Sequence, residues 1–436
     1  MSRTAVFCAA VAVSIHVATA VARLGTLVPS PAMPDFAGVY TAAWTLRHGT
    51  YMPAKWPPAM LQTLRAERGL TGEPTPVLSL PVWVWLLQPL TAYSFPTAAW
   101  IWLLVLVGLT GWSARRIAQL TQLHEWRARI AVGLLVVTFG PVVLSVTLGQ
   151  NSLVLLCAAL AAGAALRTDN GRRRIQALVL WVLAVAAKLV PAAWLVVLPL
   201  TRRGRLLAPF LAAGLAMALL AVTVTPASTQ SYVRQMPAIT TKFFHEKLGL
   251  DDQSLGAWIQ RLGRPQRFAV HGLFLEQHKV SWTLPWSFEP THLRAGGIVV
   301  IAALGLALVV ALRRTAAQEP EGALYAVVLY TLLAVPHMER YDYVLLLPAM
   351  AWLWPRGSHA RTLVLCSYCL AALSRLNHLW AAFLPGLLAA LASGFGTCAA
   401  LVLSYGVLRA LATPKMPPAT AAPGRPGMAS SAQTVE

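Results

Sequence analysis

Long runs of uncharged apolar residues constrain the fold of this chain more than any other feature. Six runs carry no charged side chain, at residues 101–109, 130–146, 153–166, 206–222, 298–312 and 399–408. With their flanks, most of them reach the ~20 residues that a helix needs to cross ~30 Å of hydrocarbon. Because a bilayer offers the backbone no hydrogen-bond partners, each crossing segment must be helical. The sequence therefore predicts an all-α, polytopic integral membrane protein.

The charge distribution supports this interpretation and orients the helices. Only 11% of the residues are charged, against roughly 25% in a soluble domain. The net charge of +20 could indicate a nucleic-acid partner. However, the arginines fill short gaps between apolar runs, which is typical of cytoplasmic loops. These gaps lie at 115–129, 172–174, 202–205 and 313–314. We therefore expect a membrane protein without a nucleic-acid partner.

The arginine-rich gaps predict a path of about 12 helices with the N-terminus inside. Two long polar loops then lie outside, at about 25–95 and 226–296. The run 175–201 has arginines at both ends, so we expect it to fold back near Lys188 and Pro191. Residues 1–412 would form one transmembrane domain. Residues 413–436, rich in Pro, Ala and Ser, are predicted to be a disordered cytoplasmic tail.

The first outer loop and the next outer turn contain candidate functional residues. Asp35 precedes a predicted helix over 36–46, which places Tyr40 on an aromatic face. It is predicted either as the N-cap of that helix or as a general base at the membrane face. Gln150 and Asn151 lie in the turn 148–153. They could bind a polar ligand or simply end a helix.

Further along the chain, polar residues interrupt apolar segments. Lys188 would lie at membrane depth, where an ionisable residue is costly and points to function, or to an internal ion pair. His337, Tyr341 and Asp342 belong to a polar group at 337–342, which is either functional or a solvated hairpin. In the second outer loop, Asp252-Gln253-Ser254-Leu255 precedes Trp258 and Arg261. This segment could simply start an amphipathic helix with Leu255, Trp258 and Leu262 on one face.

In this order, the motifs resemble glycosyltransferase family 87. The similar elements are Pro34-Asp35-Phe36 with Tyr40, Gly149-Gln150-Asn151, Lys188-x-x-Pro191, Asp252-Gln253-Ser254-Leu255 with Arg261, and Tyr341-Asp342-Tyr343. They span about residues 30–350. Two positions depart from the family pattern. An aromatic-Pro-Pro element is replaced by Leu80-Pro81-Val82, and an Asn before Gln253 is replaced by Asp252.

The resemblance implies a GT-C-like fold and a definite reaction. Enzymes of this kind move a hexose or pentose, here expected to be mannose with arabinofuranose as the alternative, from a polyprenyl-phosphate donor to a lipid or glycan acceptor. Asp35 would deprotonate the acceptor. The phosphate would be stabilised by Lys188, Arg261 and His337, and sugar hydroxyls would be bound by Gln150, Asn151, Tyr341 and Asp342. Tyr40 and Gln253 are further candidates for substrate binding.

The resemblance also implies the setting of the reaction. The protein would lie in a bacterial plasma membrane with its active site outside, and it would need no metal and no cofactor beyond the lipid-phosphate donor. The alternative is a transporter or flippase of a lipid-linked or polar solute. That alternative predicts inverted repeats with a site at the membrane midplane. No such repeat is visible, and the polar motifs gather on one face.

Overall fold

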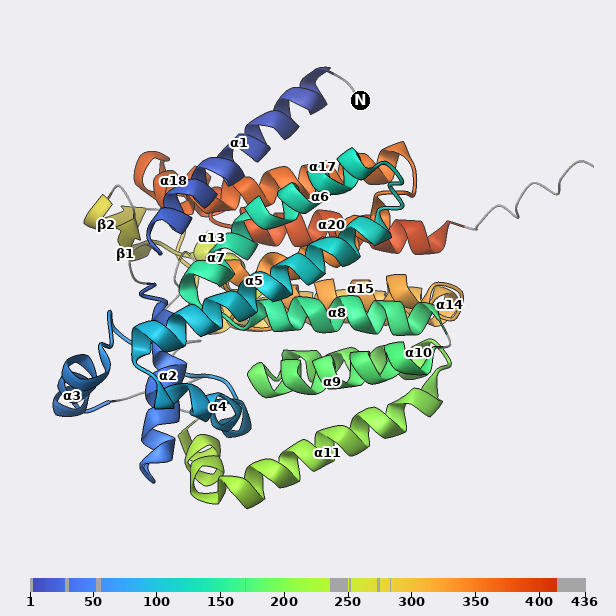
Figure 1. The fold of residues 1–436 in the computed structure, drawn as a ribbon. Coiled ribbons are helices and arrows are strands. Elements are labelled where there is room, and N and C mark those ends of the chain that lie inside the picture. The colour runs from blue at the N-terminus through green and yellow to red at the C-terminus, as the bar shows by residue number, and fades with distance from the viewer. Residues whose placement is uncertain are drawn as a thin grey trace, which may run out of the picture.

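The structure is a computed structural model that describes residues 3–27, 31–51, 56–168, 170–235, 250, 252–272, 275–282 and 284–413. The predicted tail after residue 413 and much of the second outer loop, at 236–249, lie outside these ranges. The described chain is a bundle of helices packed side by side (Figure 1). Its longer helices are α1 (Arg3–Gly25), α5 (Phe95–Leu120), α8 (Ser152–Arg167), α9 (Gly171–Ala187), α11 (Leu207–Val224), α14 (Pro290–Thr315), α15 (Pro320–Ala334), α17 (Ser358–Leu373) and α20 (Phe395–Ala412).

Several of these helices are long and apolar enough to cross a membrane. In the described residues, five qualify: Val6–Gly25, Phe95–Leu120, Gly204–Val224, Pro290–Thr315 and Phe395–Ala412. A sixth span forms if α6 (Trp126–Thr138) and α7 (Gly140–Leu148), which meet at 53°, are taken together. The predicted multi-pass membrane protein is therefore confirmed. The count of about 12 stays a prediction, because α8, α15 and the pair η2–α10 are apolar but short.

The predicted fold-back of the run 175–201 is present. Helix α9 ends at Ala187, Lys188 is extended, and the chain returns through η2 (Val190–Val196) and α10 (Val197–Leu200). The Trp181 indole donates a hydrogen bond of 2.8 Å to the Pro191 carbonyl across the turn. Both arginine-rich ends of the run consequently lie at the same end of the bundle.

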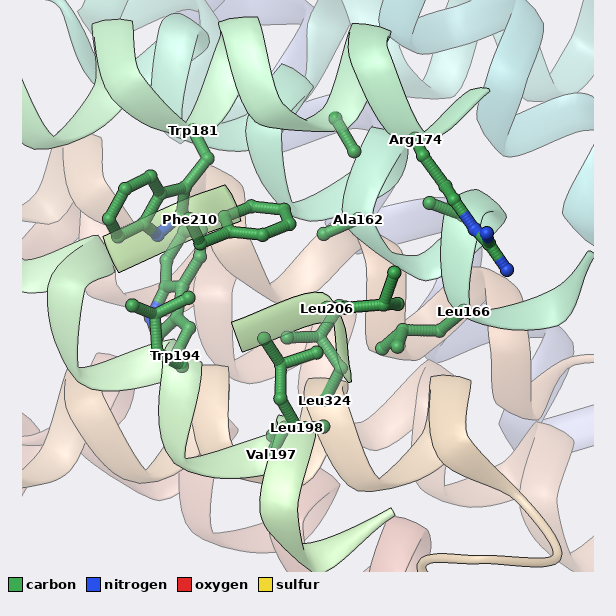
Figure 2. A pocket seen from close by; sticks show the side chains of 13 residues that line it. Ala162, Leu166, Arg174, Trp181, Trp194, Val197, Leu198, Leu206, Phe210 and Leu324 are labelled. Carbon is green, nitrogen blue, oxygen red and sulfur yellow. The ribbon is translucent and has the colours of Figure 1, made fainter. Parts of the chain in front are cut away.

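An apolar pocket of about 40 Å³ lies between the two halves of this fold-back and α11. Figure 2 shows Trp181 and Trp194 on one side of it and Arg174 on the other, with Leu206 between them. Ring contact between Trp181 and Phe210, at 5.3 Å, joins α9 to α11. This packing closes the arginine-rich end of the bundle without forming a polar site.

Short elements gather at the opposite end of the bundle (Figure 1). A two-stranded antiparallel hairpin is the one departure from an all-helical chain among the described residues, and it lies in the predicted second outer loop. The predicted helices at 36–46 and around Leu255 are both present. The short elements are α2 (Pro34–Arg47), α3 (Pro58–Arg68), α4 (Pro81–Leu87), η1 (Gln88–Ala92), α13 (Leu255–Gly263), β1 (Gln266–Gly272), β2 (Leu275–Trp282), η4 (Arg340–Leu345), η5 (Ser374–Leu376), α18 (Asn377–Phe383) and α19 (Gly386–Ala392). Helix α16 (Leu346–Leu353) follows η4 and packs Trp352 against Gly322 of α15.

An aromatic core fixes α2 against α5 at this end. The Phe36 ring stacks on Trp102 at 5.7 Å and on Phe95 at 6.1 Å. The Tyr40 hydroxyl donates a 2.8 Å hydrogen bond to the carbonyl of Tyr93. Stacked aromatic pairs bury large apolar areas, so α2 is held rigidly although it lies in a loop of the membrane topology.

Candidate active site

A cavity of about 1000 Å³ opens among these short elements. One part of its wall is apolar, with Leu78, Trp83, Leu189 and Val190, and another part is polar. Six residues predicted from the sequence as site residues line it: Asp35, Gln150, Asn151, Lys188, His337 and Tyr341. The fold thus brings together groups that are as far apart as 300 residues in the chain.

The start of α2 holds Asp35 at the cavity. Met33 precedes the helix with φ 37° and Pro34 takes its first position, so Asp35 lies in the first turn. The prediction that Asp35 is the N-cap is therefore wrong. Its carboxylate instead accepts hydrogen bonds from Thr75 Oγ1, at 2.7 Å, and from Gln150 Nε2, at 2.6 Å. These two bonds fix the orientation of the carboxylate.

Gly149 permits the contact between the 148–151 turn and α2. Its φ of 74° is left-handed, and an added Cβ would lie 2.6 Å from Cβ of Phe36. Glycine adopts such a conformation without strain and leaves the space for Phe36. The next residue, Gln150, then reaches Asp35.

The electrostatic surroundings of Asp35 suit a general base. Burial raises the pKa of this carboxyl to about 6, helped by the nearby charge of Glu339. The hydrogen bonds from Thr75 and Gln150 and the charge of Lys188 oppose that rise. Asp35 is therefore ionised at neutral pH, yet more basic than an ordinary aspartate. A base is most effective when its pKa lies close to the working pH.

Lys188 projects from the extended gap between α9 and η2. Its Nζ lies 2.6 Å from Oδ1 of Asp342, which is 1% exposed at its side chain. Ser152 Oγ donates to the same oxygen, and the Tyr341 ring lies 4.9 Å from Nζ. Asp342 does not line the cavity but holds the lysine, whose side chain is 21% exposed.

His337 is a second cation in the cavity wall. Its Nδ1 lies 3.2 Å from Oδ2 of Asp252, and its Nε2 lies 3.1 Å from Oε1 of Glu339. Burial lowers the pKa of the imidazole, but the hydrogen bonds to Asp252 and Glu339 and their charges outweigh burial and raise it to about 10. Both ring nitrogens then carry protons and donate, as two carboxylate partners require.

Glu339 and Thr75 line the cavity and bond to predicted site residues, but they were not themselves among those predictions. Glu339 lines the cavity, pairs through its backbone with Asp252 and is a hydrogen-bond partner of the Tyr341 hydroxyl. Its spacing of two residues from His337 is a signal that could have found it. Thr75 gives no signal in the sequence, because only tertiary packing carries it to Asp35.

Four predicted site residues lie outside the lining of this cavity, and their contact with substrate stays a prediction. Tyr40 is held by Tyr93, and Asp342 by Lys188 and Ser152. Gln253 is fully buried and donates to the carbonyls of Leu250 and Ser393. Arg261 is also fully buried, and it donates to Ser393 Oγ and to the Asp252 carbonyl.

The cavity contains two carboxylates, but these are not arranged as a metal site. Asp35 and Glu339 line it on different elements. Within the described ranges, no group of three or more His, Cys, Asp or Glu side chains could hold a metal ion.

A bundle of apolar helices with a largely apolar cavity at one end, lined also by a few charged and amide side chains, fits a multi-pass membrane protein. The model of glycosyltransferase family 87 matches residues 81–336, more than half of the chain. The chain belongs to this family and is accordingly a membrane glycosyltransferase. The matched region includes Gln150, Asn151 and Lys188, whereas Asp35 precedes it and His337 follows it directly. Neither the curated proteins nor the solved structures yielded a match.

Proposed function

We propose that this glycosyltransferase moves a sugar, with mannose as the expected one, from a polyprenyl-phosphate donor to a hydroxyl of a lipid or glycan acceptor. The observation that carries the proposal is the composition of the cavity. A basic carboxylate, two cations and an apolar wall lie around one space of about 1000 Å³. This combination matches the three parts of such a reaction: a hydroxyl nucleophile, a phosphate leaving group and a prenyl chain.

The cavity can accommodate a lipid phosphate. Trp83, Leu189 and Val190 offer an apolar surface to the prenyl units, and Leu189 is 54% exposed beside the cavity. Lys188 and the doubly protonated His337 offer positive charge to the phosphate. Fixed cations aimed at developing charge lower a barrier most in a site that excludes water.

The transfer step follows from these positions. Asp35 takes the proton of the acceptor hydroxyl as its oxygen forms a bond to the anomeric carbon. The bond from that carbon to the phosphate oxygen breaks, and its electron pair leaves with polyprenyl phosphate, so the configuration inverts. Gln150 and Thr75 orient the base, while Asn151, Tyr341 and Glu339 are the candidates to bind sugar hydroxyls. The proposal needs no metal and no cofactor.

The site faces outward in this proposal. The start of α2 and the turn between α7 and α8, which line the cavity, lie at the end of the bundle opposite the arginine-rich turns (Figure 1). The positive-inside rule assigns those turns to the cytoplasm. Donor and acceptor would accordingly meet on the extracytoplasmic face of a bacterial plasma membrane.

The test is a transfer assay with purified protein in nanodiscs, given radiolabelled polyprenyl-phosphate-mannose and a membrane lipid extract. We expect label in a new product with the wild type and with Glu67→Gln, an exposed carboxylate change on α3. Asp35→Asn should yield none at the same protein level. Transfer by Asp35→Asn at the wild-type rate would contradict the assigned base.

A panel of donors separates sugar identity from reaction class. Transfer from the arabinofuranose donor alone would replace mannose and leave the mechanism in place. Failure with every donor, together with movement of the labelled lipid across vesicle membranes, would overturn the proposal in favour of a flippase.

A further inference from the structure

A buried histidine far from the cavity has a hydrogen bond that the proposed reaction does not explain. His16 lies in the middle of α1 and is fully buried. Its ring lies 5.2 Å from the ring of Phe139 and 4.6 Å from that of Tyr368. Its Nδ1 accepts a hydrogen bond of 3.0 Å from the backbone N–H of Gly140, 124 residues away. A polar side chain at membrane depth is expensive, and its role requires an explanation.

That bond lies at the bend between α6 and α7. Phe139 has ψ 121°, so the helix breaks there and Gly140 begins α7. The first N–H groups of a helix have no partner within it. An unsatisfied backbone group in the membrane costs several kcal/mol. His16 satisfies one of these groups and thereby stabilises the bend.

The residues around Gly140 and His16 leave little room for a different packing at the bend. An added Cβ at Gly140 would lie 2.6 Å from Cδ of Arg375, so the glycine leaves room for this side chain. The backbone of Tyr368 and the charge of Arg375 also act on the His16 ring. The bond from the Gly140 N–H to Nδ1 requires an unprotonated Nδ1.

Helix α7 connects this bend to the cavity. It is only nine residues long and carries contacts to the site along its length. Ser145 Oγ donates to the Tyr341 carbonyl at 3.2 Å. At its far end, the Trp102 indole donates to the Gly149 carbonyl at 2.9 Å, and Gln150 reaches Asp35. A change in the direction of α7 at Gly140 would consequently move Gln150 relative to the carboxylate.

We propose that His16 is a positioning residue of the transferase, which sets the direction of α7 and through Gln150 the orientation of Asp35. This inference rests on the proposed role of Asp35. It assigns His16 no contact with substrate.

The test compares substitutions of His16 that keep or remove a hydrogen-bond acceptor at the position of Nδ1. Asn places an amide oxygen close to the position of Nδ1, whereas Leu has similar bulk and no acceptor. We expect His16→Leu to lower kcat by on the order of 10- to 100-fold, the scale of a misplaced catalytic group. KM should change little. His16→Asn should retain most of the wild-type kcat.

The pH profile provides a readout that a purely structural role would not change. The Gln150 bond holds the pKa of Asp35 down. The acid limb of kcat/KM should therefore move to higher pH in His16→Leu, as in Gln150→Leu, and stay in place in His16→Asn. The double variant His16→Leu/Gln150→Leu should be no slower than Gln150→Leu alone.

Equal losses in His16→Leu and His16→Asn, an unmoved acid limb, or additive effects in the double variant would each overturn the inference. If His16→Leu does not fold, His16→Gln takes its place, because its amide lies near the Nε2 position and should not restore the bond. An inactive Asp35→Asn beside an unaffected His16→Leu would refute the role of His16 alone. An active Asp35→Asn would refute the proposed function itself.

Discussion

Two polar clusters lie at the same end of the bundle, and they differ in what their side chains face. The cavity cluster contains Asp35, Lys188 and His337, which line an open space. The buried cluster contains Gln253, Arg261 and Asn377, which have no exposed surface. Gln253 and Arg261 donate to the backbone carbonyls of Leu250, Asp252 and Ser393. In the proposed mechanism, charged groups of the cavity cluster take part in the chemistry, whereas those of the buried cluster anchor the chain.

The two clusters meet at Asp252. Its carbonyl accepts from Arg261, and its carboxylate accepts from His337. The backbone N–H of Gln253 also donates to the Met338 carbonyl at 2.7 Å. The buried cluster therefore holds Asp252 in place, and Asp252 in turn positions His337. The comparison predicts that substitutions in the cavity cluster reduce turnover, whereas those in the buried cluster reduce stability.

The largest effect is expected from Asp35→Asn. Removing a general base lowers kcat by about 10²–10⁴-fold.

Because burial raises the pKa of Asp35 in the folded state, the free energy of unfolding falls as pH rises from the usual aspartate range through about 6. The asparagine variant avoids that cost, so its melting temperature at pH 7 should equal or exceed that of the wild type. Thermal unfolding beside the transfer assay checks both; a lower melting temperature would contradict this account.

Lys188→Met should reduce stability as well as turnover. It leaves the Asp342 carboxylate buried without its cation, which costs about 3–5 kcal/mol when one partner of a buried pair is removed. The double variant Lys188→Met/Asp342→Asn should regain much of the melting temperature and remain inactive. Recovery of activity in the double variant would show that Lys188 only neutralises Asp342.

Substitutions in the buried cluster should change stability alone. Gln253→Leu leaves the Leu250 and Ser393 carbonyls and the Gly396 N–H without this partner, at about 1–3 kcal/mol for each unsatisfied group. The folded fraction should keep a KM within about twofold of the wild type. The reason is that the Gln253 side chain is not part of the cavity wall. A large rise in KM with an unchanged melting temperature would return Gln253 to substrate binding.

The smallest expected effect is a shift in the pH profile. Asp35 must be ionised to act, so kcat/KM should rise with pH through about 6. His337 stays protonated up to about 10, so no loss of its charge is expected between pH 6 and 9. Gln150→Leu removes a bond that lowers the pKa of Asp35, and the acid limb should move upward. A limb at the ordinary aspartate pKa near 4 would contradict the burial of this carboxylate.

The sequence was informative where local composition decides the structure. Apolar runs and arginine-rich gaps predicted the main helices, and the arginines at both ends of 175–201 predicted the reversal at Lys188. The ordered motifs predicted the family. These signals are local because membrane insertion depends on segment hydropathy and flanking charge.

Tertiary packing decided the remaining features. Gln253 and Arg261 were predicted to bind substrate. In the structure, residues around Ser393 cover both side chains. The N-cap prediction for Asp35 failed because the helix begins at Pro34, two residues earlier than expected. The 53° bend at Phe139 is contacted by His16, 124 residues away in sequence, through its hydrogen bond with Gly140. No periodicity in the sequence reports such contacts.

The ion pair of Lys188 and Asp342 has a consequence for the synthesis of the protein. The two residues are 154 positions apart, and Lys188 follows a helix that must insert long before Asp342 is made. At translation rates of about 5–20 residues per second, the gap lasts roughly 8–30 s. During that interval the lysine lacks the carboxylate that it pairs with in the folded protein. The completed site is thus assembled late, when the helices after Glu339 insert and bring the missing carboxylate to the amine.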